Sequence, residues 1–342
     1  MNNYKVSIII PCYNIESNNY TLFQEMFQSL IKQTFNNMNM EIIMVDDKSP
    51  DNTRKILQNL EKQYSNIKLI LLDENNGASN ARNQAIKQAT SDYIMFLDAD
   101  DKYCPDFVET AYNTIKKYDI DFLLSNYIIY MNNTLTKFDT GFNKQIITNN
   151  KKDELQYATK FFWTGIYNKS FLIENNIIFP KIGHGDDSLF LSKCICCTKK
   201  DIILLNDYYS VIYTADNGKS ITHTFTKSQL EDLINAYTHI IDSYQEYDLN
   251  KVFIQSQLKL YILVLMTVVI RSTEDYNTQK IMVNQVSQVI SMYDYNYQLT
   301  FYWRIIHSLI LNKQYILLYI VSKLIKSIFE QKWFIKHFRN KE

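Results

Sequence analysis

The chain has 342 residues, a length that predicts roughly two domains. Lysine plus arginine and aspartate plus glutamate each number 36, so the net charge is zero. This balance argues against a general nucleic-acid binder, which carries a basic excess. The five cysteines lack zinc-finger spacing, and we expect small core residues in a reducing compartment. They are Cys12, Cys104, Cys194, Cys196 and Cys197.

Up to residue 98 the sequence alternates between two hydrophobic periods. Continuous apolar runs, typical of strands buried on both faces, occupy 6–10, 41–47, 67–73 and 92–98. The segments between them, 22–33, 53–64 and 77–90, have apolar residues at helical spacing. This alternation predicts an α/β fold with a parallel, doubly wound sheet and right-handed crossovers.

Polar residues follow each of the four predicted strands. The strand ends read PCYN, DDKSPD, DENNG and DADD. Parallel sheets of this kind bind ligands at the carboxyl ends of their strands. One acidic turn can be a simple helix N-cap, and we assign that role to Ser49 and Asp51. Four polar strand ends on one edge favour a binding cleft.

The pattern changes near residue 225, where we place a domain boundary between 1–225 and 226–342. Beyond it five segments read as amphipathic helices and few strand signals occur. The helices are expected over 227–247, 250–271, 276–293, 299–312 and 314–337. The most apolar stretch, 258–270, falls short of the roughly 20 residues that span a bilayer. The N-terminus also lacks the pattern of a signal peptide, so we expect a cytoplasmic protein.

The DADD motif places two carboxylates, Asp98 and Asp100, on either side of Ala99 at a strand end. A divalent cation between them would cancel their repulsion. Mg²⁺ and Mn²⁺ prefer oxygen ligands and commonly bridge to substrate phosphates. The alternative is an exposed acidic turn that caps the next helix near Pro105, and the spacing alone does not choose between them.

Taken together, VSIIIPCYN, VDDKSPDNT, NNGASNARNQAI and YIMFLDADD resemble the nucleotide-binding half of family 2 glycosyltransferases, of the bacterial surface-polysaccharide type. The order and spacing of the four motifs match across roughly residues 4 to 225. The resemblance implies a GT-A fold, which is a Rossmann-like catalytic domain with a mixed central sheet, followed here by a C-terminal α-helical domain. It also implies a UDP-sugar donor and Mn²⁺ or Mg²⁺ as cofactor.

The resemblance assigns roles to donor-side residues. Pro11, Tyr13 and Asn14 would lie near the base and ribose, where the Tyr13 ring can stack on a nucleobase. Asp47 would accept a hydrogen bond from the base N3–H, which favours uracil over cytosine. The alternative for the Asp46–Asp47 pair is one inward-facing and one capping acid.

The same resemblance places Arg82 near the base and phosphates, with a solvated helix face as its alternative. Asp98, next to Ala99, would contact the ribose or a metal-bound water. Asp100 would be the main protein ligand of the metal. The resemblance leaves Asp101 without an assigned role.

A second constellation, GHGDDSLF at 183–190, precedes a predicted helix. Acids at a helix N-terminus have an ordinary explanation in capping. This segment also resembles the acceptor-side motif of the family, where a Glu-Asp pair precedes the helix and the Asp is the general base. Asp187 matches that base, and Asp186 replaces the usual Glu.

Three further positions have two readings each. His223 falls where the family often has a late metal-ligating histidine, but a lone histidine is more often structural. Lys219 is a candidate phosphate contact or a solvated lysine. Trp163 could stack on a sugar or pack in the core.

The chain ends in a predicted basic amphipathic helix. Residues 323–342 combine six cations with aromatic and aliphatic residues. Such a helix can lie on an anionic membrane surface, and the alternative is packing on neighbouring helices or on another subunit.

These features predict an inverting, metal-dependent glycosyltransferase that moves a sugar from a UDP-sugar to a growing surface glycan. The acceptor would be a capsule, exopolysaccharide or wall polymer, in lipid-linked form in one version. The competing hypothesis is a non-catalytic nucleotide-sugar-binding or scaffold subunit of a glycan-assembly complex.

Overall fold

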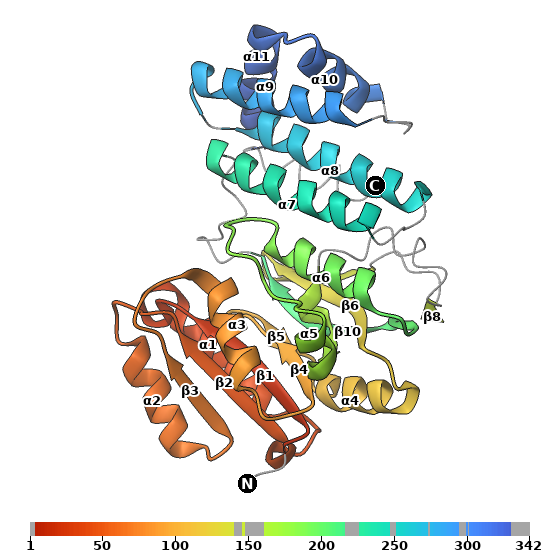
Figure 1. Cartoon of the computed structure of the whole chain (residues 1–342). Helices are drawn as coiled ribbons and strands as arrows, with labels where there is room; N and C mark the ends of the chain where they lie inside the picture. Colours follow the sequence, from red (N-terminus) through yellow and green to blue (C-terminus); the bar gives the residue numbers. More distant parts are fainter. Residues whose placement is uncertain are drawn as a thin grey trace. The chain divides into compact units, whose positions relative to one another are not determined.

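The computed structural model describes residues 4–139, 146–147, 161–215, 226–246, 251–272, 274–293, 299 and 301–329 (Figure 1). The chain forms two compact units. The first, here called the sheet unit, comprises Met1–Ile182 and Asp186–Ser220. The second, the helical unit, comprises Gly183–Gly185 and Ile221–Glu342. Three residues immediately before Asp186 therefore belong to the helical unit.

The sheet unit contains a mixed sheet with the strand order β3-β2-β1-β4-β9-β6-β10-β5. Its first four strands are parallel to one another. They are β1 (Val6–Cys12), β2 (Met40–Asp46), β3 (Ile67–Leu71) and β4 (Tyr93–Phe96). Residues 6 to 10 of β1 are all buried, because helices cover both faces of a parallel sheet. The predicted α/β fold is confirmed.

The remaining strands make the sheet mixed, as the family resemblance implied. β9 (Ile166–Asn168) runs antiparallel to both β4 and β6 (Phe122–Met131). β10 (Ile202–Thr214) is parallel to β6. Three short strands pair antiparallel at the margins: β5 (Lys102–Tyr103), β7 (Thr134–Phe138) and β8 (Ile146–Ile147).

Register brings the parallel strands to one edge. Cys12 at the end of β1 pairs with Asp46 at the end of β2, which in turn pairs with Leu71 at the end of β3. The helices α1 (Ile15–Ile31), α2 (Thr53–Gln63) and α3 (Gly77–Gln88) each follow one of these strands. The polar motifs after the strands therefore gather at the same edge, as predicted.

An aromatic cluster fills the core beneath this edge. Phe96 of β4 contacts Phe162, Phe179 and Phe190 edge to face, and all four rings are fully buried. Phe179 and Phe190 stack with ring centroids 4.1 Å apart. Phe190 lies on α6 (Asp186–Cys197), so this packing fixes the helix that carries the two acids of the GDD segment. Two further helices, α4 (Phe107–Tyr118) and α5 (Lys169–Glu174), complete the described part of this unit.

The helical unit contains five described helices, and they agree with the five predicted segments. They are α7 (Lys227–Glu246), α8 (Lys251–Arg271), α9 (Tyr276–Met292), α10 (Phe301–Leu311) and α11 (Tyr315–Phe329). The predicted continuation of the last helix, 330–337, lies outside the described residues. Among the described helices, none is long and apolar enough to cross a membrane. All five cysteines are free thiols, and Cys12, Cys194 and Cys196 are buried.

Candidate active site

One buried arginine contacts both the DADD motif and the GDD segment, which lie far apart in the sequence. Arg82 on α3 is 5% exposed, and its Nη2 donates a hydrogen bond of 2.6 Å to Asp98 Oδ1 just beyond β4. Its Nη1 lies 3.9 Å from Asp186 Oδ2 at the start of α6. Burial alone would lower the pKa of Arg82, but the charges of Asp98, Asp187 and Asp186 outweigh it and raise the pKa. The alternative of a solvated helix face for Arg82 is therefore wrong.

Aromatic rings support the same guanidinium. Its central carbon lies 4.9 Å from the Phe162 ring centroid and 5.3 Å from that of Phe179, within cation–π range. Asn83 fixes Phe179 in place, because its side chain donates to the Phe179 carbonyl at 2.7 Å and accepts from the Phe179 N–H at 2.9 Å. The sequence motifs did not point to Phe162, Phe179 or Asn83. The adjacency of Arg82 and Asn83 in the ARN motif was the available signal.

Asp187 lies in an environment that disfavours its ionised form. Burial, followed by the negative charge of Asp186, raises the pKa of Asp187 well above the ordinary aspartate range, and Arg82 only partly opposes this. Asp186 has a partner besides Arg82, because it accepts a hydrogen bond from Ser79 Oγ on α3. Ser79 was also missed, and it precedes Arg82 by three residues, one turn of the same helix.

Asp101 is structural. Its side chain is 2% exposed, and its Oδ1 accepts a hydrogen bond of 2.8 Å from the Thr214 N–H at the end of β10. Burial, and then the charges of Asp100 and Asp98, raises the pKa of Asp101 well above its usual value. The DADD turn is therefore tied to β10 through one aspartate. Its other two acids, with Ala99 between them, are part-buried.

The predicted metal site is only partly within the described residues. Asp98 and Asp100 are present at the end of β4, whereas His223 and Lys219 lie outside the described residues. Across the described part of the chain, no group of three or more acidic, histidine or cysteine side chains could hold a metal. Asp98, Asp100 and Asp101 crowd three acids into one turn, and a divalent cation would relieve the repulsion between them. Two carboxylates alone would leave the remaining coordination positions to water and substrate.

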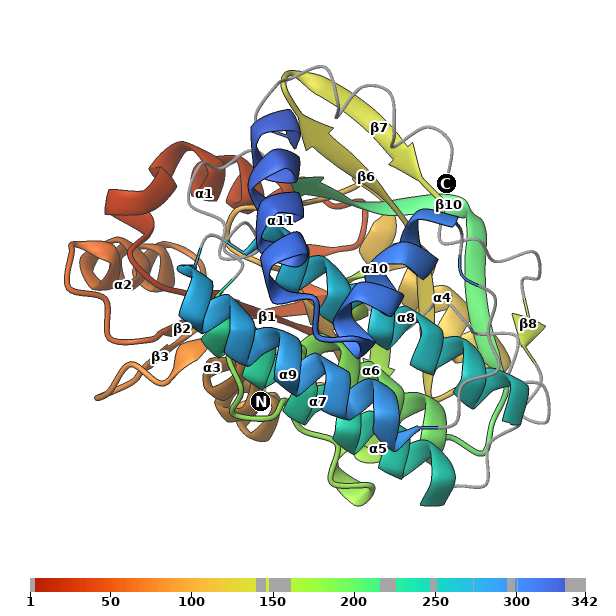
Figure 2. The ribbon, with the colours of Figure 1, turned by 90° about the horizontal axis from the view of Figure 1, so that it is seen from above.

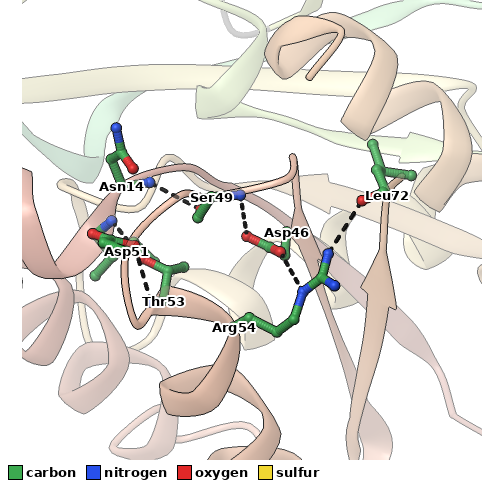
Figure 3. Close-up of polar contacts among 8 residues, drawn as sticks. Asn14, Asp46, Ser49, Asp51, Thr53, Arg54 and Leu72 are labelled. Carbon is green, nitrogen blue, oxygen red and sulfur yellow. Dashed lines mark hydrogen bonds and ion pairs between the residues drawn. The ribbon is translucent and has the colours of Figure 1, made fainter. Parts of the chain in front are cut away.

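The acids after β2 have partners within the chain (Figure 3). Asp46 is fully buried and accepts from the Ser49 N–H at 3.1 Å and from Arg54 Nε at 3.1 Å. Asp47 accepts from the backbone N–H groups of Asn76 and Gly77, at 3.0 and 2.7 Å, at the start of α3. These contacts match the alternative given for the pair, in which one acid faces inward, here Asp46, and the other caps a helix, here Asp47 on α3. Each oxygen of Asp47 retains a second lone pair, so the contact to a base N3–H stays a prediction.

The end of β1 joins the same loop. Asn14 has a left-handed backbone, with φ of 52°, and its N–H donates to Ser49 Oγ at 3.0 Å. Asp51 accepts from the Ser17 and Thr53 N–H groups at 2.9 and 3.0 Å, so its capping role is confirmed. Beside this loop Tyr13 is 45% exposed, an available ring for stacking. Pro11 is part-buried in β1.

Trp163 belongs to the core. It is 7% exposed, and its ring centroid lies 5.0 Å from that of Tyr127 and 5.8 Å from that of Tyr213. The core-packing alternative is confirmed for this residue, and it presents no free face to a sugar.

The glycines before Asp186 are required by packing. Gly185 has φ of +86°, and a Cβ there would lie 2.8 Å from the Ala236 Cβ on α7. A Cβ on Gly183 would lie 2.5 Å from Asp232 Oδ2, and His184 Nδ1 lies 3.4 Å from the same oxygen. The segment is thus packed on α7, and any side chain at Gly185 would displace it.

Comparison with known proteins agrees with this geometry. The family model described as glycosyl transferase family 2 matches residues 7–174. A poly(ribitol-phosphate) beta-glucosyltransferase of Bacillus spizizenii is 31% identical over 242 residues, which are 68% of this chain and 36% of that protein. The Escherichia coli UDP-Glc:alpha-D-GlcNAc-diphosphoundecaprenol beta-1,3-glucosyltransferase WfgD is 39% identical over 135 residues, 40% of this chain and 50% of that protein. The matched regions therefore span half or less of these two relatives.

The solved structure of S. aureus TarS 1-349 in complex with UDP-GlcNAc shares the fold, with a TM-score of 0.69. The match covers 96% of this chain and 92% of that one at 21% identity. The fold is that of a GT-A enzyme with C-terminal helices. The chain belongs to glycosyl transferase family 2.

Proposed function

We propose that the chain is an inverting, metal-assisted glycosyltransferase that moves a sugar from a UDP-sugar to a hydroxyl group of a surface glycan. The observation that carries this proposal is the shared guanidinium of Arg82. It links Asp98 of the donor-side motif to Asp186 of the acceptor-side motif, directly beside Asp187. A donor and an acceptor handled by these two motifs would meet within a few ångströms.

Asp187 would act as the general base. An acceptor hydroxyl is a poor nucleophile until a base removes its proton in the transition state. The raised pKa of Asp187 makes its carboxylate a stronger base once it is ionised. A single base opposite the leaving group is enough for one in-line displacement with inversion, and no carboxylate nucleophile is needed.

Asp98 and Asp100 would hold the divalent cation, Mn²⁺ or Mg²⁺, with His223 as a further candidate ligand. When bound, such a cation stabilises the charge that develops on a departing diphosphate. Arg82 adds a fixed positive charge at the same edge of the sheet. Lys219 remains a candidate contact to the diphosphate.

On the donor side we assign the uridine to Pro11, Tyr13, Asn14 and Asp47. Support comes from the exposed Tyr13 ring and from the UDP-GlcNAc named for the TarS structure. For the acceptor we propose a growing wall or capsular glycan, since one relative is named for poly(ribitol-phosphate) and another for a diphosphoundecaprenol-linked sugar. We further propose that residues 1–225 bind the donor and carry out the transfer, and that 226–342 contact the acceptor or a partner.

A donor panel tests the assignment. We expect at least one UDP-sugar with Mn²⁺ to raise the melting temperature of the chain, because ligands that bind only the native state stabilise it. Metal-dependent release of UDP in the presence of an acceptor would support the enzyme. Donor binding without any turnover by the parent chain would support the non-catalytic scaffold, and no response to any UDP-sugar would exclude both.

A further inference from the structure

Exposed apolar side chains gather on one part of the helical unit. Eighteen large apolar side chains are exposed among the described residues, and seven of them lie between 302 and 324. They are Tyr302, Ile305, Leu311, Ile316, Leu317, Ile320 and Leu324, and we call them the α10–α11 apolar face. The exposed fraction reaches 65% at Ile316 and 58% at Leu324. Isolated exposed apolar residues are normal, whereas a cluster of this size marks an interaction surface.

The geometry of α11 makes this face continuous. Ile316, Ile320 and Leu324 recur every four residues, so they form one stripe along the helix. The opposite side of the helix is buried, with Leu318 and Ser322 at most 1% exposed. Figures 1 and 2 show α10 and α11 adjacent in the helical unit, with α8 and α9 between them and α7. The packing of α11 on its neighbours therefore leaves its apolar stripe uncovered by the described helices.

Charge selects the partner for this face. Residues 299–329 contain no Asp or Glu, whereas Arg304, Lys313, Lys323 and Lys326 are present. Arg304 and Lys313 are exposed. Residues 299–342 carry eight Lys and Arg against two Glu, a net charge of +6, so the remainder of this neutral chain carries −6. Of these cations, Arg304 and Lys313 are exposed in the same stretch of chain as the exposed apolar side chains.

We propose that the α10–α11 apolar face docks on the surface of an anionic lipid bilayer. An interfacial helix combines an apolar stripe, which enters the headgroup boundary, with lysine and arginine that meet anionic headgroups. Among the described helices, none is long and apolar enough to span a bilayer. A two-fold dimer through this face would oppose the cations of α10 and α11 to one another, and neither helix carries an acid, so a second copy is the poorer occupant.

The sequence left a membrane contact at 323–342 as one of two alternatives, and the described surface lies earlier, at 302–324. This surface needs no glycosyl transfer to bind lipid. Its test is therefore independent of the proposed enzyme activity.

Vesicle flotation of the full chain tests the proposal. We expect the chain to float with vesicles of phosphatidylglycerol and phosphatidylcholine, to bind weakly to phosphatidylcholine alone, and to be released by high salt. The triple variant Ile316→Gln, Ile320→Gln, Leu324→Gln should lose most of this binding. Its matched control, Met38→Gln, Ile173→Gln, Ile178→Gln, changes exposed apolar residues of the sheet unit and should bind as the parent chain does.

The cations are tested separately. Arg304→Gln with Lys313→Gln should weaken flotation by roughly fivefold for each charge removed, and Lys55→Gln with Lys62→Gln is the control. Circular dichroism should show unchanged melting of every variant, because the substituted side chains are exposed. Equal binding to neutral and anionic vesicles, or no binding to either, would overturn the proposal.

Two other results identify a different occupant. If the parent chain is a dimer by light scattering and the triple variant is a monomer, the face is a subunit interface. If the triple variant floats normally and only the substitution of Lys332, Lys336 and Arg339 reduces flotation, the lipid contact lies in the terminal segment. Either result would overturn the assignment to α10 and α11.

Discussion

Two strand ends of the same sheet treat their aspartates differently. After β2, Asp46 and Asp47 receive hydrogen bonds from Ser49, Arg54 and the start of α3, all within the sheet unit. At the end of β4, Asp98 shares one guanidinium with Asp186 of α6, and burial followed by neighbouring negative charge raises the pKa of Asp101 and Asp187. The first arrangement is electrostatically complete. The second holds an excess of carboxylates, which a cation and a substrate proton would relieve.

The largest expected effect comes from removing the proposed base, Asp187. Asp187→Asn should lower kcat by roughly 10²- to 10⁴-fold, the usual contribution of general acid–base catalysis, while donor binding persists. Asp51→Asn, on the β2 side, is the matched control because its carboxylate only caps backbone N–H groups. Initial rates and donor titration measure both effects. Comparable loss of kcat in the two variants would show that Asp187 has no special role.

Removal of the shared cation should have the next largest effect. Arg82→Gln leaves Asp98, Asp186 and Asp187 without their buried counter-charge, and we expect a loss of about 3–5 kcal/mol in the free energy of unfolding. Arg54→Gln is the control on the β2 side. Its side chain is 42% exposed and Asp46 keeps the Ser49 N–H, so a loss of about 1 kcal/mol is expected.

Urea unfolding at equal protein concentration measures the two arginine variants. Equal losses of stability would show that the acids at the two strand ends depend equally on their arginine partners. A gain of stability in Arg82→Gln would mean that the three acids are protonated in the native state and need no counter-charge.

The proposed cation site can be tested separately from the proposed base. Asp100→Asn should raise the Mn²⁺ concentration needed for half-maximal activity by at least on the order of tenfold, because a neutral amide is a weaker ligand for a hard cation. Asp51→Asn should leave that concentration unchanged. The stabilisation of the chain by Mn²⁺ with UDP, read by thermal melting, provides a second measurement. Identical metal titrations for Asp100→Asn and the parent chain would remove Asp100 from the metal site.

The pH dependence of activity and of stability provides a further test of Asp187. In the proposed mechanism transfer requires ionised Asp187, so its raised pKa would place the acid limb of kcat/KM at higher pH than an ordinary aspartate would. For stability the sign is opposite. The native state holds this proton more tightly than the unfolded state, so stability is lost as pH rises through the raised pKa. Asp187→Asn should therefore melt at higher temperature than the parent chain above neutral pH, and the difference should vanish in acid.

Local sequence patterns predicted the elements of the fold well. The apolar runs 6–10 and 41–47 and the helical period in 53–64 depend on neighbours in the chain, and the observed β1, β2 and α2 agree with them. The order of the strands in the sheet does not follow from such local patterns. β9 lies between β4 and β6 through contacts between residues that are distant in sequence. Only the family resemblance indicated a mixed sheet.

The acidic residues of the site were predicted from their motifs, but the contacts that link them were not. Asp98, Asp186 and Asp187 were named from their motifs, yet their link through Arg82 depends on how α3 packs against α6. The Phe162 and Phe179 rings under Arg82 read as ordinary core residues, since nothing in their own neighbourhood indicates a cation above them. Charged residues whose partners are far away in sequence are thus the ones that pattern analysis places least well.

The smallest expected effect concerns Asp47, the acid after β2 that we propose contacts the nucleobase of the donor. Asp47→Asn keeps one acceptor oxygen for α3 and loses the second, so we expect a cost of about 1 kcal/mol in the free energy of unfolding. The amide can donate to the N3 acceptor of cytosine, which a carboxylate cannot do. The ratio of UDP to CDP affinity should therefore fall several-fold, as measured by competition with a bound UDP-sugar. Arg54→Gln alters the same strand end without touching this carboxylate and should keep the parent ratio. An unchanged ratio in Asp47→Asn would restrict this acid to capping α3 and would leave the choice of base to Tyr13, Asn14 and the backbone around them.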